Sequence, residues 1–181
     1  SKNVLHKKAL AKKLNSKSAE TIGDIKSDII LIAVNDDAIS KVALQLNNSE
    51  AIIAHTSGSV NIAVLNHLKN YGVFYPLQTI NKNRKVYFKN VPICIEGNNK
   101  KTEKQLLQLA SSISKNIYLL NSEQRLHAHL AAVIAKEATA LALEGAQPQR
   151  CFARQEIARH LARVVRQRQR TDLLDLDRGP L

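Results

Sequence analysis

Apolar, strand-like runs alternate with amphipathic, helix-like segments along the first 120 residues, and this alternation constrains the fold more than any other feature of the sequence. The runs that predict strands are 29–34, 51–54, 72–77, 92–96 and 116–120, with a shorter candidate at 20–22. The segments that predict helices are 4–15, 36–47, 60–70 and 100–114. Strands that alternate with helices form a mainly parallel sheet with helices on both faces. We therefore expect an α/β fold.

The run 29–34 is almost continuously apolar, which is typical of a strand buried on both faces. Asn35, Asp36 and Asp37 interrupt it, and Asp36 or Asp37 is expected to cap the following helix. Ser59 has the same role before the helix expected at 60–70. These boundaries place polar residues directly after two neighbouring strands.

Length and composition allow one sizeable core with a helical appendage. No apolar run approaches the roughly 20 residues that a membrane span needs, and the Lys-rich N-terminal segment lacks the apolar stretch of a signal peptide. A cytoplasmic protein is therefore expected. Cys94 lies in an apolar run and Cys151 in an Arg-rich one, without metal-ligand spacing, so both are expected to be reduced and Cys94 to be buried.

The formal net charge of +12 invites comparison with nucleic-acid-binding proteins. The lysines are nevertheless scattered through helices and loops, with few aromatic residues among them to stack on bases. A solvated basic surface is the better interpretation, and no specific nucleic-acid partner is expected. A basic surface that recruits an anionic partner remains the alternative.

Composition changes near residue 137. All 17 lysines lie at or before Lys136, whereas 8 of the 10 arginines lie at Arg150 or later, and 137–181 contains neither Ser nor Asn. Either this segment is a natural helical tail, or it follows a junction produced by fusion, frameshift or design, which we favour. Apolar residues at 152–165 recur with helical spacing between arginines, so an amphipathic helix is expected there.

Ligands of open α/β sheets bind beyond the carboxyl ends of the strands. That rule selects three segments, of which the first contains Asn35 and Asp36, the second is 55–59 and the third is 75–79. In the second, hydroxyls at Thr56, Ser57 and Ser59 and close approach at Gly58 suit a ribose or a substrate carboxylate. A simple strand-to-helix cap explains the same residues. The spacing of a serine-hydrolase nucleophile elbow, Gly-x-Ser-x-Gly, is not present.

Four ordered segments carry a more specific signal: AVNDDAI at 33–39, HTSGSV at 55–60, GVFYPLQTI at 72–80, and PICIEG at 92–97 followed by SEQRLHAHLAAVIA at 122–135. Together they resemble the Rossmann-like proteins that carry domain of unknown function 2520, relatives of pyrroline-carboxylate reductase and of deazaflavin-dependent NADP oxidoreductases. The resemblance covers about residues 4–135. It implies an NAD(P)-binding Rossmann domain followed by a helical domain that closes over the nicotinamide and often forms a homodimer.

Two departures accompany the resemblance. The family's proteins begin with a strand, a Gly-rich turn and a helix, which hold the pyrophosphate, and this unit of about thirty residues has no counterpart here. After HLAAV the family continues with an Asn-Asn-Phe type of sequence, where this chain has Lys136 and Glu137. We therefore expect an incomplete Rossmann-type domain at 1–121 and a helical segment at 122–181, atypical from about 137, with cofactor binding weakened or lost.

Position at the carboxyl ends of the strands and residue chemistry, taken together with the resemblance, suggest roles for individual residues. Val34, Asn35, Asp36, Thr56, Ser57 and Gly58 are expected at the NADP or NAD cofactor, and His55, Ser59, Tyr75, Gln78, Thr79 and Arg125 at the substrate. His129 resembles the family's shared histidine, a general acid or base, although a helix histidine without a catalytic task is the competing interpretation. His127 projects elsewhere and is expected to be exposed, and the pair lacks a third metal ligand. Arg125 binds either a ligand anion or a carboxylate such as Glu123.

The sequence thus predicts an NAD(P)-dependent oxidoreductase of unknown small-molecule substrate, inactive if the missing unit is essential. A non-catalytic binding module with a basic surface is the alternative from another class. A fragment without independent function is the third, and it predicts poor solubility or molten behaviour.

Overall fold

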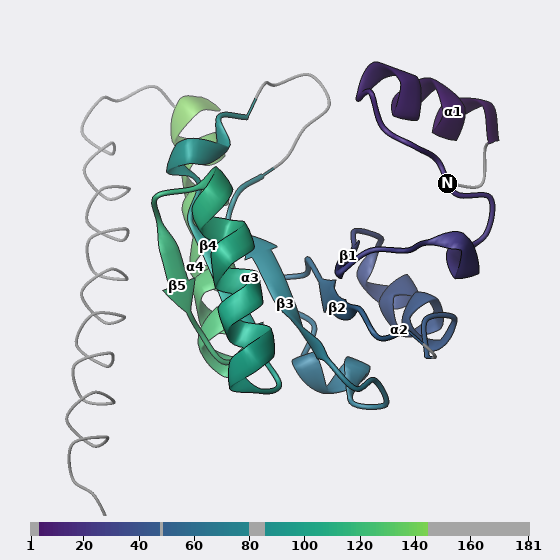
Figure 1. Cartoon of the computed structure of the whole chain (residues 1–181). Coiled ribbons are helices and arrows are strands. Elements are labelled where there is room, and N and C mark those ends of the chain that lie inside the picture. The colour runs from purple at the N-terminus through teal and green to yellow at the C-terminus, as the bar shows by residue number, and fades with distance from the viewer. Residues whose placement is uncertain (1–3, 48, 80–85, 145–181) are drawn as a thin grey trace, which may run out of the picture. The chain divides into compact units, whose positions relative to one another are not determined.

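The computed structural model describes residues 4–47, 49–79 and 86–144, and it divides the chain into two compact units, Ser1–Leu120 and Asn121–Leu181. The first unit contains a five-stranded sheet in the order β1-β2-β3-β4-β5 (Figure 1). The strands are β1 (Ile29–Ile32), β2 (Ile52–His55), β3 (Tyr71–Pro76), β4 (Ile93–Gly97) and β5 (Ile117–Leu119). All neighbours pair in parallel except β3 and β4, which are antiparallel. The predicted α/β fold with a mainly parallel sheet is confirmed.

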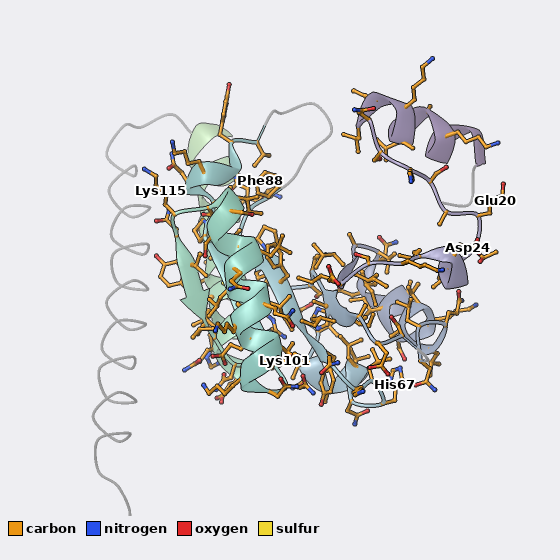
Figure 2. The ribbon with its side chains drawn as sticks, viewed as in Figure 1. Glu20, Asp24, His67, Phe88, Lys101 and Lys115 are labelled. Carbon is orange, nitrogen blue, oxygen red and sulfur yellow. The ribbon has the colours of Figure 1, made fainter. Side chains whose placement is uncertain are left out.

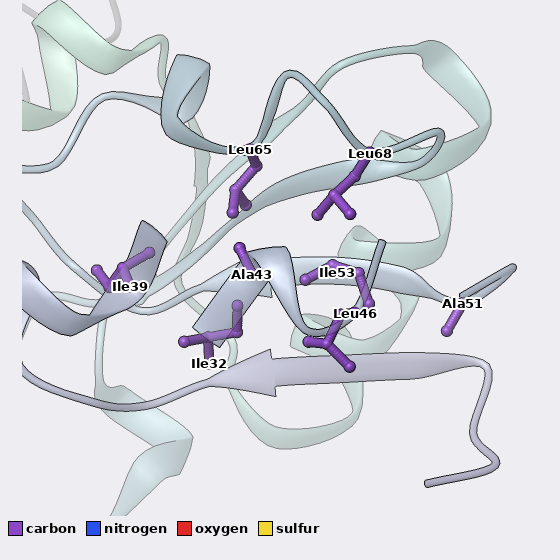
Figure 3. Packing of buried hydrophobic residues seen from close by; sticks show 8 residues of the cluster. All are labelled: Ile32, Ile39, Ala43, Leu46, Ala51, Ile53, Leu65 and Leu68. Atoms are coloured by element: carbon purple, nitrogen blue, oxygen red, sulfur yellow. The ribbon is translucent and has the colours of Figure 1, made fainter. Parts of the chain in front are cut away.

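One face of the sheet is covered by α2 (Asp36–Leu44). Ile39 and Ala43 of this helix pack against Ile32 and Ile53 of the sheet, and all four side chains are at most 3% exposed (Figure 3). Burying an Ile side chain contributes about 1.5–3 kcal/mol relative to exposure, so this cluster holds α2, β1 and β2 as one body. The first turn of α2, which carries Asp36 and Asp37, is thereby fixed beyond the end of β1.

The other face is covered by α3 (Lys100–Ile113), which closely matches the helix predicted at 100–114. Leu106 and Ala110 are fully buried against a cluster that includes Phe74 and Ile95. The approach is close at Gly72, where an added Cβ atom would lie 2.6 Å from Leu106 Cδ1. Helices therefore lie on both faces of the sheet, as the alternating pattern predicts.

The prediction that the first apolar run is buried on both faces is wrong. β1 ends at Ile32 and lies at the edge of the sheet, and Leu31 and Val34 are 40% and 43% exposed. Within the described ranges, no strand pairs with the outer edge of β1. The inner edge of β1 pairs in parallel with β2, and Ile32 is buried.

Two predicted elements have a different structure. The strand candidate at 20–22 is replaced by η1 (Ile22–Asp24), a 3₁₀ turn closed by the Thr21 N–H, which donates to Asp24 Oδ2 at 2.9 Å. The helix predicted at 60–70 is reduced to η2 (Ile62–Leu65). Asn61, not Ser59, caps η2, because its Oδ1 accepts from the Ala63 N–H at 2.8 Å. Three β-branched residues at Val60, Ile62 and Val64 also disfavour a longer helix.

The remaining elements carry less of the core. The predicted N-terminal helix is α1 (Val4–Lys13), although Leu10 and Leu14 of its apolar side are 47% and 64% exposed. A further 3₁₀ turn, η3 (Phe88–Asn90), precedes β4. The second unit contains α4 (Ser122–Glu144), whereas Cys151 and the helix expected at 152–165 lie outside the described residues.

Exposed lysines lie near both ends of α3. Lys101 lies in the first turn of α3, and Lys115 lies just beyond the last residue of this helix, Ile113 (Figure 2). Cys94 on β4 is a free cysteine and 1% exposed, which confirms its predicted burial. No helix in the described part of the chain is long and apolar enough to cross a membrane.

Candidate functional site

Two loops lie next to each other at the carboxyl ends of β1 and β2. Ile32 and His55 are paired in the register of these parallel strands, so residues 33–36 and 56–61 continue from the same edge of the sheet. Thr56 extends the pairing, because its N–H and its Oγ1 hydroxyl both donate to the Ile32 carbonyl, at 3.2 and 3.3 Å. Thr56 therefore anchors the second loop to β1.

Ser57 organises the second loop. Its side chain is buried, and its Oγ accepts hydrogen bonds from the backbone N–H groups of Ser59 at 3.2 Å and Val60 at 3.1 Å. Gly58 is buried within the same turn. Side-chain acceptors of this kind fold a serine-containing turn without any help from a ligand.

His55 stabilises the turn through a hydrogen bond. Its imidazole is completely buried, and Nδ1 accepts a hydrogen bond from the Ser57 N–H at 3.2 Å. A neutral imidazole that accepts at Nδ1 carries its hydrogen on Nε2. The contact joins His55 to the serine backbone and not to its hydroxyl, which accepts from two other groups. The pair is therefore not an activated serine nucleophile.

Asp36 links the two loops. The Ser59 hydroxyl donates to Asp36 Oδ2 at 2.6 Å, and Ser57 Oγ lies 3.3 Å from Ser59 Oγ. Asp36 is in the first turn of α2, which Asn35 begins as the N-cap residue, so the prediction that Asp36 or Asp37 caps the helix is wrong. The sequence placed Asp36 and Ser59 at the same edge but carried no sign of their direct bond, because that depends on the spacing of the strands.

The structure places the other predicted residues of this unit around the same edge or next to it. Val34 and Asn35 are exposed in the first loop. Tyr75 is half-buried near the end of β3, opposite Cys94. Gln78 and Thr79 are exposed just beyond β3, and the Gln78 N–H donates to the Pro76 carbonyl at 2.8 Å. Hydrogen bonds thus join Asp36 to 55–59, whereas the residues after β3 belong to the next loop.

Arg125 and His129 lie in the second unit, on α4. Asn121 and Gln124 cap this helix reciprocally, with side-chain to backbone bonds of 2.9 and 3.0 Å. Arg125 is 1% exposed and its Nη2 donates to Ser122 Oγ at 3.2 Å. His129, one turn later, is half-buried, and His127 is exposed as predicted. The cap residues fix the start of the helix and hence the position of Arg125 along it.

Other polar features lie elsewhere. Lys69 Nζ lies 2.8 Å from Glu50 Oε2, and this contact lowers the pKa of Glu50 below its ordinary value. Glu50 also lines a cavity of about 340 Å³ at the amino ends of β1 and β2, the edge opposite the candidate site. No group of three or more His, Cys, Asp or Glu side chains that could hold a metal ion occurs among the described residues.

Comparison with family models gives a match over part of the chain. Residues 91–170 match the model of the Domain of unknown function (DUF2520), a segment that continues past the change in composition at 137. This match and the similarity to solved structures bear out the resemblance to Rossmann-like DUF2520 proteins. No curated protein matches it significantly.

Two solved structures are similar to this chain. A "putative NADP oxidoreductase" from Bacteroides fragilis is 32% identical, with a TM-score of 0.70 over 80% of this chain and 60% of that one. A protein from Thermotoga maritima, 23% identical, shares the fold with a TM-score of 0.64 over 84% of this chain and 64% of that one. The chain thus spans less than two thirds of the length of either protein.

Proposed function

We propose that this chain is part of an NAD(P)-dependent oxidoreductase that acts on a small molecule. The observation that carries the proposal is the pair of joined polar loops at the carboxyl ends of β1 and β2, the edge at which open α/β sheets bind ligands. The similarity to a protein whose name states NADP oxidoreductase activity supports the same conclusion.

The loops fit the reactive end of a nicotinamide nucleotide. Asp36 and Ser59 present polar atoms at the exposed side of the turn that contains Gly58. Val34, Asn35 and Asp36 form the proposed cofactor edge together with 56–58. Bound there, NADP or NAD would supply the hydride-transfer chemistry, and the protein would supply binding and orientation.

The proposed substrate contacts come from His55, Ser59, Tyr75, Gln78, Thr79 and Arg125. His129 is the proposed general acid or base, which moves a proton on or off a substrate oxygen or nitrogen. Arg125 has a planar guanidinium suited to a substrate carboxylate or phosphate. We also propose that the chain forms a homodimer through its helical segment. This proposal rests on the resemblance alone.

The test is calorimetric titration of the purified chain with NADPH and with NADH, at low and moderate salt, after a cooperative melt has been verified. Saturable binding that persists at moderate salt, with an affinity weakened by the lack of the Gly-rich unit, is the expected result. A folded chain that binds neither nucleotide would contradict the proposal for this protein.

The net charge of +12 favours a second candidate, a non-catalytic module that recruits an anionic partner. Heparin serves as the polyanion in a parallel titration. Affinity for heparin that falls steeply with salt, without saturable nucleotide binding, would favour this candidate, because such affinity comes from counterion release.

A further inference from the structure

A cavity of about 340 Å³ lies at the amino ends of β1 and β2, at the edge of the sheet opposite the candidate functional site. Three segments of the first unit form it: η1 with the residues that follow it, the C-terminal end of α2, and the loop before β2. Ligand pockets have volumes of about 300–1,000 Å³, so this cavity is large enough for a small molecule. None of its lining residues belongs to the candidate functional site.

Hydrogen bonds hold these segments together around the cavity. The Ile52 N–H donates to the Asp28 carbonyl at 2.9 Å, which fixes the start of β1 beside the start of β2. The Ser49 N–H donates to the Leu46 carbonyl at 3.0 Å, and the Ala51 N–H donates to Ser49 Oγ at 3.2 Å. Leu46 and Ala51 are also buried at this end of the core (Figure 3). The cavity is therefore part of the folded unit.

Part of the cavity lining is apolar. Ile22 is half-buried and packs against the core cluster that contains Leu46, which is 5% exposed. Ile25, just after η1, is 39% exposed. An apolar group of a ligand placed against these side chains would remove apolar surface from water, which is favourable.

The unbalanced charge of the cavity is positive. Its lining contains one lysine, Lys26, and one carboxylate, Glu50. Glu50 is neutralised by residues outside the lining, because the hydrogen bond and charge of Lys69, with the charge of Lys101, lower its pKa below the ordinary value. Lys26 makes no ion pair with any other described residue. Its ammonium group is therefore the charge that a ligand would meet.

Two neutral donors accompany Lys26. Ser49 Oγ accepts a backbone N–H, and its hydroxyl hydrogen has no acceptor within the described ranges. The Gln45 side chain is exposed at the C-terminal end of α2, and its amide nitrogen carries two further hydrogens. Ser27 does not add to this set, because its hydroxyl donates to the Ile29 carbonyl at 2.8 Å. An ammonium with hydroxyl and amide donors suits a carboxylate.

We infer that this cavity binds a small aliphatic monocarboxylate. Lys26, Ser49 and Gln45 hold the carboxylate, and the apolar chain lies against Ile22 and Ile25. The inference goes beyond the proposed function and does not depend on it, because the cavity and the candidate functional site lie at opposite edges of the sheet.

The test compares matched probes by amide chemical-shift mapping of the full chain, which detects the weak binding expected of so small a ligand. 4-Methylpentanoate carries the carboxylate and a branched apolar chain. 4-Methylpentanamide has the same shape without the charge, and acetate has the charge without the chain. 4-Methylpentanoate is expected to shift the amide signals of Lys26, Ser49 and Ala51 until they saturate. The amide and acetate are expected to bind at least about tenfold more weakly, because each lacks one set of contacts.

Two lysine variants separate recognition from general charge. Lys26→Met keeps an apolar side chain of similar length but removes the ammonium group, and it is expected to weaken 4-methylpentanoate about tenfold. Lys115→Met, beyond the end of α3, makes the same change in net charge outside the cavity. It is expected to leave the affinity within about twofold, because screened surface charges contribute little. A native-like amide spectrum establishes the fold of each variant.

Several results would overturn the inference. One is an amide that binds as tightly as the acid, because the charge would then not be recognised. Another is inorganic phosphate that gives the same shifts, because the cavity would then bind any anion. Equal affinities of Lys26→Met and Lys115→Met also count against it. The comparison of acid and amide uses the unchanged chain, so it decides the matter even if a variant fails to fold.

The cofactor separates this inference from the proposed function. If 4-methylpentanoate binds as expected and NADPH does not bind, the cavity assignment stands and the proposed function fails. If NADPH binds and displaces 4-methylpentanoate, the assignment is overturned, because the acid would then occupy the opposite edge of the sheet.

Discussion

The Ser57 N–H donates to His55 Nδ1 at 3.2 Å, so a completely buried imidazole holds the turn that contains the candidate site. The bond also brings the end of β2 and the turn into one structural unit with Thr56, which is anchored to β1. A change at His55 is therefore expected to act first on the turn and only then on any ligand.

Replacing His55 by Leu is expected to destabilise the protein by about 1–3 kcal/mol, because the Ser57 N–H, within a buried residue, loses its acceptor. His55→Asn places an amide oxygen near the Nδ1 position and retains the acceptor. Urea unfolding measures the stability, and amide hydrogen exchange at Ser57 reports the bond itself. Exchange that is equally slow in both variants would show that this bond does not hold the turn.

The close contact between α3 and the sheet gives a second prediction. Gly72→Ala is expected to destabilise by about 1–3 kcal/mol, because the new methyl group would overlap Leu106 and the Glu96 carbonyl. Gly97→Ala is expected to act similarly, with its Cβ atom 2.7 Å from the Glu103 nitrogen.

Thermal melts measure the stability of these variants. Ser40→Ala, at an exposed position of α2, is the control, and its stability is expected to stay within about 0.5 kcal/mol of that of the unchanged chain. Gly72 and Gly97 variants as stable as the control would mean that α3 adjusts without cost.

The contact between Glu50 and Lys69 gives a dependence on pH. The hydrogen bond and charge of Lys69 lower the pKa of Glu50 below its ordinary value of 4.5. The ion pair therefore stabilises the fold at pH values above 4.5, and this contribution is lost as the pH falls through the lower pKa of the folded state. Both side chains are largely exposed, so the effect is small and is screened by salt.

Glu50→Gln is thus expected to lower the melting temperature slightly at pH 7, and not at pH values below the folded-state pKa or in high salt. Glu20→Gln, at an exposed carboxylate before η1, is the matched control. A Glu50 effect that is unchanged by acid would assign it to something other than the charge.

The sequence predicted most elements of the fold because their signals are local. The helix predicted at 100–114 differs from α3 by one residue, since amphipathic spacing and the Asn99 cap fall within a single segment. It did not predict the exposed edge of β1 or the reduction of 60–70 to η2. An apolar run indicates that a strand is suited to burial. Whether the strand is buried depends on which other segments lie beside it.

The candidate site was predictable only in part. The rule for carboxyl ends selected the loops that contain Asp36 and Ser59, because topology alone fixes which loops meet. The bond between these residues, the role of Thr56 in anchoring the turn and the cap at Asn61 depend on distances of about 3 Å between atoms of different segments. The periodicity of a sequence does not predict distances between atoms of different segments.

The outer edge of β1, with which no strand of the described residues pairs, gives the last prediction. By the alternation of the parallel ladder, Ile29 and Leu31 direct their backbone groups away from β2, and the Ile29 carbonyl accepts from the Ser27 hydroxyl at 2.8 Å. The strand lacks the charges and prolines that protect natural edges, and the Leu31 side chain is 40% exposed. Association of the purified chain at this edge is therefore expected at high concentration.

Leu31→Lys is expected to raise the solubility limit and to change the free energy of unfolding by less than about 1 kcal/mol, because the lysine side chain can extend into solvent. Ile32→Lys, one residue away but 3% exposed, is the matched control and is expected to cost about 3 kcal/mol or more. Light scattering against concentration and urea unfolding measure the two effects separately. If Leu31→Lys destabilises the chain as much as Ile32→Lys does, the outer edge of β1 is covered in solution, and the exposed Leu31 side chain is part of a contact.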